Sequence, residues 1–108
     1  MPKKEQPFIT MEADGQKTLI QKIERSTEQE LIGHWHEEVG ELMQAINKWK
    51  RYMNSIDNES YLENLHEEIG DALYLTMVLR EHFGAEKVDE ILRTKTKERI
   101  QKHFGIRE

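Results

Sequence analysis

The feature that most constrains this chain is an acidic seven-residue segment that occurs twice. One copy spans His36–Leu42 and the other His66–Ala72, and both have a histidine, two glutamates and a glycine in the same order. Two related segments on long helices that a short loop joins predict two copies of one helical unit, packed as an antiparallel pair. The glycine of each copy, Gly40 or Gly70, is expected to mark close packing between these helices.

Apolar residues around both copies recur every three or four positions, the spacing of one face of an α-helix. With Ser26 and Ser60 as predicted N-caps and Gly84 as a predicted stop, helices are expected at about residues 15–25, 26–53, 60–83 and 86–103. No segment alternates like a β-strand, so the predicted fold is all-α, a bundle of about four helices. In the third helix the apolar stripe places Ile69, Leu73 and Phe83 in the core.

The length of 108 residues predicts a single domain. Residues 1–13 contain both prolines and lack helical periodicity, so they are expected to form an N-terminal arm before one helical domain at residues 14–108. A domain of this size buries only part of its apolar surface alone. We therefore expect partner subunits to complete the core.

Charge and composition exclude several classes of protein. A net charge of −5 disfavours general binding to nucleic acid, which requires a basic surface. The absence of cysteine removes disulfides, thiolate metal ligands and cysteine nucleophiles. The sequence also has neither an apolar run of membrane-spanning length nor a signal-peptide core, so a cytoplasmic protein without a membrane partner is expected.

The acids of each repeat fall on different sides of their helix. At about 100° per residue, each helix directs an i, i+3 pair of acids at or beside its apolar face. The glutamate that precedes each pair, Glu37 or Glu67, falls on the opposite side. The inward pairs are Glu38 with Glu41 and Glu68 with Asp71.

Four carboxylates facing one interior predict a bound cation. Each ionised carboxylate buried without a partner costs several kcal/mol, and neighbouring acids repel. Oxygen-only ligands favour Mg²⁺, with Mn²⁺ as a substitute. Two alternatives remain open. The acids could form a solvated surface, or Glu63 and His66 could belong to a di-iron site, although the second Glu-x-x-His of that pattern is missing.

Basic residues supply candidate ligands for a phosphorylated substrate. On the last predicted helix Lys95 and Arg99 continue the apolar stripe of Ile91 and Leu92, where they would meet phosphate oxygens. Lys48, near the end of the first long helix, is a third candidate. The alternatives are that the two stripe cations extend to the surface and that Lys48 compensates the helix dipole.

These acidic motifs resemble those of the MazG-like all-α nucleoside triphosphate pyrophosphohydrolases, in which E-E-x-x-E is followed by E-x-x-D. The two elements here are Glu37-Glu38-Val39-Gly40-Glu41 and Glu68-Ile69-Gly70-Asp71. The family's phosphate-contacting element on the last helix has a partial counterpart at Lys95–Arg99, where Lys97 stands in place of the usual asparagine.

The resemblance implies Mg²⁺-dependent hydrolysis of a (deoxy)nucleoside triphosphate to the monophosphate and pyrophosphate, including the removal of non-canonical nucleotides. It implies a homodimer or homotetramer, with Lys95 and Arg99 at the phosphates. Glu37 and Glu38 would be the catalytic acids. The implied metal ligands are Glu38, Glu41, Glu68 and Asp71. The alternative function is a non-catalytic helical oligomer that binds nucleotides or protein.

Overall fold

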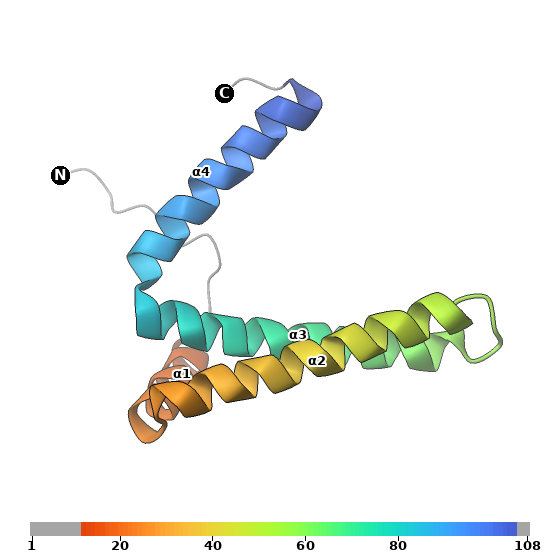
Figure 1. The fold of residues 1–108 in the computed structure, drawn as a ribbon, viewed down its shortest axis with the longest axis horizontal. Coiled ribbons are helices and arrows are strands. Elements are labelled where there is room, and N and C mark those ends of the chain that lie inside the picture. Colours follow the sequence, from red (N-terminus) through yellow and green to blue (C-terminus); the bar gives the residue numbers. More distant parts are fainter. Residues whose placement is uncertain (1–11, 106–108) are drawn as a thin grey trace.

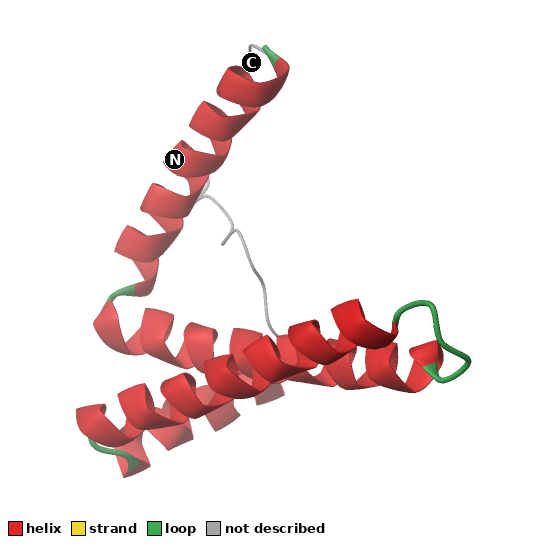
Figure 2. Cartoon of the chain, turned by 45° about the vertical axis from the view of Figure 1, so that its right-hand side comes forward, coloured by secondary structure: helices red, strands yellow, loops and turns green. Residues whose placement is uncertain are grey.

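The computed structural model describes residues 12–105, which form four α-helices and no strand. The helices are α1 (Ala13–Arg25), α2 (Glu28–Tyr52), α3 (Asn58–Phe83) and α4 (Ala85–Phe104). α2 and α3 lie side by side as an antiparallel hairpin (Figure 1), and a short loop joins them at its far end (Figure 2). α1 lies against α3, and α4 leaves the end of α3 at a steep angle. The predicted all-α fold is confirmed; the predicted arm lies almost entirely outside the described residues.

The start of α2 differs from the prediction by one residue. Thr27 is the N-cap: its hydroxyl accepts the Glu30 N–H at 3.1 Å, while the Glu30 carboxylate accepts the Thr27 N–H at 3.2 Å. The predicted cap, Ser26, instead ends α1, where its N–H donates to the Ile23 carbonyl. Because Ser26 closes the preceding helix, the reciprocal cap moves to the next hydroxyl.

The other predicted helix ends are partly correct. Ser60 is not an N-cap, since α3 begins two residues earlier and the Ser60 hydroxyl donates to the Asp57 carbonyl at 3.0 Å. Gly84 separates α3 from α4 with φ of +128°, and Gly105 ends α4 in the left-handed region at +64°. Both conformations favour glycine, which has no Cβ to clash there.

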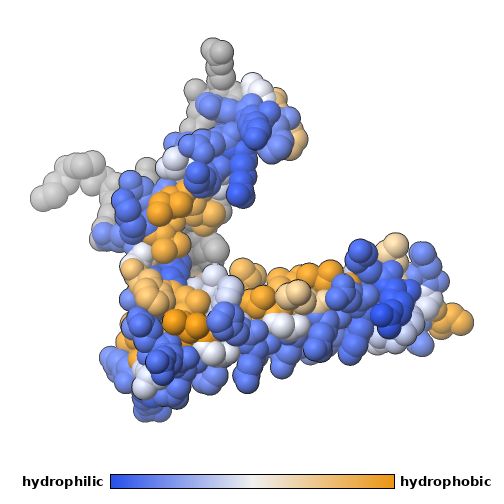
Figure 3. All heavy atoms as spheres, viewed as in Figure 1, coloured by the Kyte–Doolittle hydropathy of each residue, from blue (hydrophilic) through white to orange (hydrophobic). Residues whose placement is uncertain are grey.

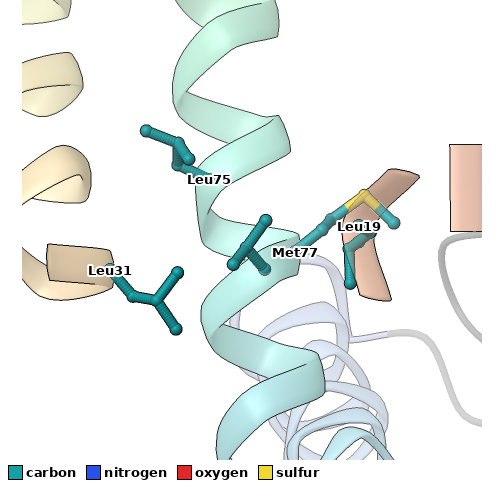
Figure 4. Close-up of a cluster of buried hydrophobic side chains, with 5 residues drawn as sticks. Leu19, Leu31, Leu75 and Met77 are labelled. Atoms are coloured by element: carbon teal, nitrogen blue, oxygen red, sulfur yellow. The ribbon is translucent and has the colours of Figure 1, made fainter. Parts of the chain in front are cut away.

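A small apolar core lies where α1, α2 and α3 meet (Figure 4). Trp35 of α2 packs against this core, and its indole N–H donates to the Thr76 hydroxyl of α3 at 3.0 Å. This bond ties the two helices of the hairpin together beside the acidic repeats. The buried residues are Leu19 from α1, Leu31 from α2, and Leu75, Met77 and Val78 from α3.

A second apolar face of α3 remains uncovered. Ile69, Leu73 and Phe83, which the sequence predicts in the core, are exposed, so that prediction is wrong for the single chain. α3 is apolar on more than one side, and α1 and α2 cover the sides of Leu75, Met77 and Val78. Figure 3 shows apolar atoms along the side of the hairpin that faces the opening toward α4.

The repeat glycines do not mark a close helix contact within this chain. A Cβ placed on Gly40 or Gly70 would have no neighbouring atom within 4 Å, so the predicted close packing is wrong here. Gly70 is exposed and Gly40 half-buried, which puts both away from any backbone contact. None of the helices between residues 12 and 105 combines the length and the apolar character that crossing a membrane requires.

Candidate metal centre

Three carboxylates from the two acidic repeats come together on the α2–α3 hairpin. Glu38 and Glu41 lie one turn apart on α2, and Glu68 comes from α3; one oxygen of each lies within 4.8 Å of the other two. Glu38 and Glu68, the equivalent residues of the two repeats, are half-buried, whereas Glu41 is exposed. The predicted inward pairs are only half correct: Glu38 and Glu68 are turned partly inward by the antiparallel packing, whereas Glu41 and Asp71 are exposed.

Both half-buried acids lie in an unfavourable electrostatic environment. Burial raises the pKa of Glu38 above its ordinary value, and the charges of Glu41 and Asp71 raise that pKa further. Burial also raises the pKa of Glu68, and the charges of Glu41 and Glu38 add to the effect. In each case less water and more negative charge disfavour ionisation.

The buried oxygens of this group fit a divalent cation. Oε2 of Glu38 and Oε2 of Glu68 are both inaccessible to solvent, and neither has a hydrogen-bond partner within residues 12–105. A buried acceptor without a donor costs free energy that a cation would recover. Three carboxylates on rigid helices form an all-oxygen donor set of the kind that suits Mg²⁺ or Mn²⁺.

An open pocket of about 330 Å³ adjoins these carboxylates. Glu37 and Asp71 line it together with Glu38, although neither belongs to the group of three oxygens. Lys22 and His34 also line the pocket, and the Lys22 ammonium lies 3.0 Å from Nδ1 of the His34 ring. The remaining lining residues are Tyr74 and Leu75.

The predicted phosphate ligands lie elsewhere in the single chain. Lys95, Arg99 and Lys48 are all exposed, and none is among the residues that line the pocket. Lys95 pairs with Glu98 of its own helix at 3.7 Å. α4 points away from the hairpin and contacts chiefly α3 (Figure 1). The stripe of Ile91 and Leu92 that Lys95 and Arg99 continue therefore has no core to pack against in the single chain. The phosphate-binding role of these three residues stays a prediction.

Sequence reasoning missed Lys22 and His34 as residues of the pocket. Lys22 follows the buried Leu19 by three residues, which places it on the core-facing side of α1. That spacing is the only sequence signal for Lys22, because its contact with His34 joins two different helices and leaves no pattern in the sequence. Glu63 and His66, the half-pattern of a di-iron site, are exposed and lie outside the carboxylate group.

The fold and the site define a class: small all-α proteins in which a helical hairpin gathers two acidic motifs into a candidate metal centre. Within this class, the family model of the MazG nucleotide pyrophosphohydrolase domain matches residues 26–104, and the chain belongs to this family. Membership implies nucleotide pyrophosphohydrolase activity and a nucleotide substrate, and it confirms the family predicted from the acidic motifs. Comparisons with curated proteins and with solved structures gave no match.

Proposed function

We propose that this protein hydrolyses a (deoxy)nucleoside triphosphate between its α and β phosphates, releasing the monophosphate and pyrophosphate. The observation that carries the proposal is the pair of buried, unpartnered oxygens on Glu38 and Glu68. Equivalent residues of two repeats converge with Glu41 on one point, in a chain of the MazG family. Non-canonical nucleotides fall within the proposed substrate class.

Four acids of the hairpin would hold Mg²⁺, or Mn²⁺ in its place. Glu38, Glu41 and Glu68 already bring oxygens together. Asp71 is included because it lines the adjoining pocket and its charge raises the pKa of both half-buried acids. When bound, the metal neutralises phosphate oxygens and favours ionisation of a nearby water.

Glu37 would accept a proton from the attacking water. It lines the pocket beside Glu38 but lies outside the three-oxygen group, so this role does not compete with metal binding. The water oxygen bonds to the α phosphorus. The bond from that phosphorus to the oxygen bridging the α and β phosphates breaks, and pyrophosphate leaves with the electron pair of that bond. Because the half-buried carboxylates lie on the two packed helices of the hairpin, they would hold the reacting phosphate at one position.

A second copy of the chain would complete the molecule. The exposed apolar face of α3 and the exposed Val88 and Ile91 of α4 support a homodimer or homotetramer, because such surfaces are normally covered. An α4 from a partner, packed on the hairpin, would bring exposed cations such as Lys95 and Arg99 toward the pocket. Their predicted contact with phosphate would then be made between subunits.

A substrate panel tests the proposed function. Pyrophosphate release is measured with canonical and modified nucleoside triphosphates, with Mg²⁺ and with EDTA. We expect Mg²⁺-dependent release that falls at least about 100-fold in Glu38→Ala and in Glu68→Ala. Glu67→Ala is the matched control: this exposed acid, next to Glu68, should leave activity unchanged. Nucleotide binding without turnover, or activity retained in both site variants, would contradict the proposal and favour a non-catalytic binding protein.

A further inference from the structure

The pocket beside the acidic group is lined by side chains of both charges. Its acids are Glu37, Glu38 and Asp71. The ammonium of Lys22 is brought to the pocket by α1, and the ring of His34 comes from α2, one turn before Glu37 and Glu38. The proposed reaction uses the acids and a metal and assigns nothing to Lys22 or His34.

The contact between Lys22 and His34 determines which hydrogen-bonding groups these two side chains present to the pocket. A lysine ammonium can only donate, so Nδ1 of His34 accepts this hydrogen bond of 3.0 Å and the neutral ring holds its proton on Nε2. The bond orients Lys22 without neutralising its charge. Because an ammonium has three N–H donors, two remain for other acceptors. Both side chains are half-buried, which reduces screening by solvent.

We infer that Lys22 binds a phosphate oxygen of the substrate in this pocket, with His34 holding it in place. The inference rests on the proposed function, since the ligand is the triphosphate of that reaction. A triphosphate offers only acceptors and negative charge, so binding it in a pocket that also holds carboxylates requires a donor. Lys22 provides that donor from within the same chain, whereas Lys95, Arg99 and Lys48 do not line the pocket.

Inorganic pyrophosphate is a suitable probe, because its binding does not depend on the nucleobase. Its affinity is measured by isothermal titration with saturating Mg²⁺, and the affinity for Mg²⁺ alone is measured separately. Lys22→Gln should weaken pyrophosphate binding about ten-fold or more, because it removes a charge-assisted hydrogen bond. Mg²⁺ binding should stay at the wild-type level, a result that a general loss of structure would not give.

Two further variants complete the experiment. Lys22→Arg keeps the charge but arranges its donors differently, so it should bind pyrophosphate more tightly than Lys22→Gln. Lys17→Gln removes an exposed lysine of the same helix that does not line the pocket, and it should have no effect. If Lys22→Gln is poorly folded, Lys22→Met takes its place, because it keeps an unbranched side chain without the charge, and wild-type pyrophosphate binding by that variant would overturn the inference.

The outcomes separate this inference from the function on which it rests. If the wild-type protein binds pyrophosphate and Lys22→Gln binds it equally well, the assignment of Lys22 is wrong and the proposed function stands. If the wild-type protein releases no pyrophosphate from any nucleotide of the panel and does not bind it with Mg²⁺, the proposed function itself fails and the inference fails with it.

Discussion

Among the single residues, Glu38 and Glu68 combine a structural cost with a candidate function. Each is a half-buried acid placed beside other acids, and each has a buried oxygen without a partner in the described chain. Without a cation, these carboxyls must either stay protonated or destabilise the folded chain by their mutual repulsion. Their protonation therefore couples stability to pH and to metal.

The raised pKa values of Glu38 and Glu68 predict that stability without metal falls as pH rises. The ordinary carboxyl pKa is 4.5, and the folded chain raises it at both residues. The stability linked to them is complete below pH 4.5 and is lost as pH rises through the raised values, because the folded state then binds more protons than the unfolded state. Urea unfolding in EDTA, followed from pH 4.5 upward, measures this decline.

Saturating Mg²⁺ should oppose the decline, because it binds the ionised carboxylates of the folded chain. Glu38→Gln keeps the shape and removes one charge, so it should flatten the pH profile in EDTA and raise the unfolding midpoint by about 4 °C at neutral pH. Glu67→Gln, an exposed neighbour, should behave as the wild type. A wild-type stability in EDTA that rises across this range would refute the coupling.

Single residues also show which parts of the site can be predicted from sequence. The positions of Glu38 and Glu68 follow from helical periodicity, because two copies of one repeat place equivalent residues on equivalent faces of two packed helices. Lys22 could not be assigned in this way. Its place in the pocket depends on how α1 crosses the hairpin, and one short helix carries no pattern that specifies such a crossing.

At the scale of helices, the junction of α3 and α4 is held by an ion pair. Nε and Nη2 of Arg80 donate to the two carboxylate oxygens of Asp89 at 2.7 and 2.6 Å, across the turn at Gly84. The hydrogen bond from Arg80 lowers the pKa of Asp89 below its usual value. Both groups are nearly buried, and the two-point contact fixes an orientation as well as a distance.

Replacing Asp89 by alanine should therefore loosen α4. It leaves the poorly solvated Arg80 guanidinium with the more exposed Glu81, 3.3 Å from Nη1, in place of its two-point partner. Breaking a buried pair of this kind costs about 3 kcal/mol. Amide hydrogen exchange should become faster along the first turns of α4, and urea unfolding should move to lower concentration. Lys87→Gln is the matched control, since its pair with Glu90 is exposed at 3.8 Å and is expected to contribute about 0.5 kcal/mol or less. Equal effects of the two variants would show that the Arg80 pair does not hold the junction.

The helices also show where prediction from sequence reaches its limit. The number, class and approximate bounds of the helices follow from periodicity and from Gly84 and Gly105. The buried face of α3 does not follow. Residues 72–79 are mostly apolar, so a single stripe cannot be identified, and packing decides that Leu75 and Val78 are inside while Leu73 is outside. Neighbouring helices in the sequence pair with each other, so that pairing can be predicted. Which of two apolar faces of a helix is buried depends on the other helices that pack against it.

At the scale of the whole molecule, the single chain is too open for its length. Its radius of gyration is 17.2 Å, whereas a compact domain of about 100 residues has about 13 Å. α4 extends away from the hairpin, and the apolar faces on either side of the opening are uncovered (Figure 3). Burying these faces would recover about 25 cal/mol for each Å² of apolar surface, a term that the single chain does not gain.

Self-association through these faces predicts the effect of two charged substitutions. Leu73 on α3 is 49% exposed and Ile91 on α4 is 51% exposed, so neither contributes much to the core of one chain. If a second copy covers them, Leu73→Glu or Ile91→Glu places a charge in an apolar interface and should weaken association by about 100-fold or more. Analytical ultracentrifugation measures the change, with a dimer or tetramer expected for the wild type.

Ile56→Glu is the matched control for these substitutions, because Ile56 is equally apolar but lies fully exposed in the loop at the far end of the hairpin. It should leave the sedimentation of the wild type unchanged. If Lys95 and Arg99 act on a neighbouring subunit, pyrophosphate release should fall together with association in the two interface variants, although each keeps its own carboxylate group. A monomeric wild type that is active would show instead that one hairpin suffices and that the exposed faces have another role.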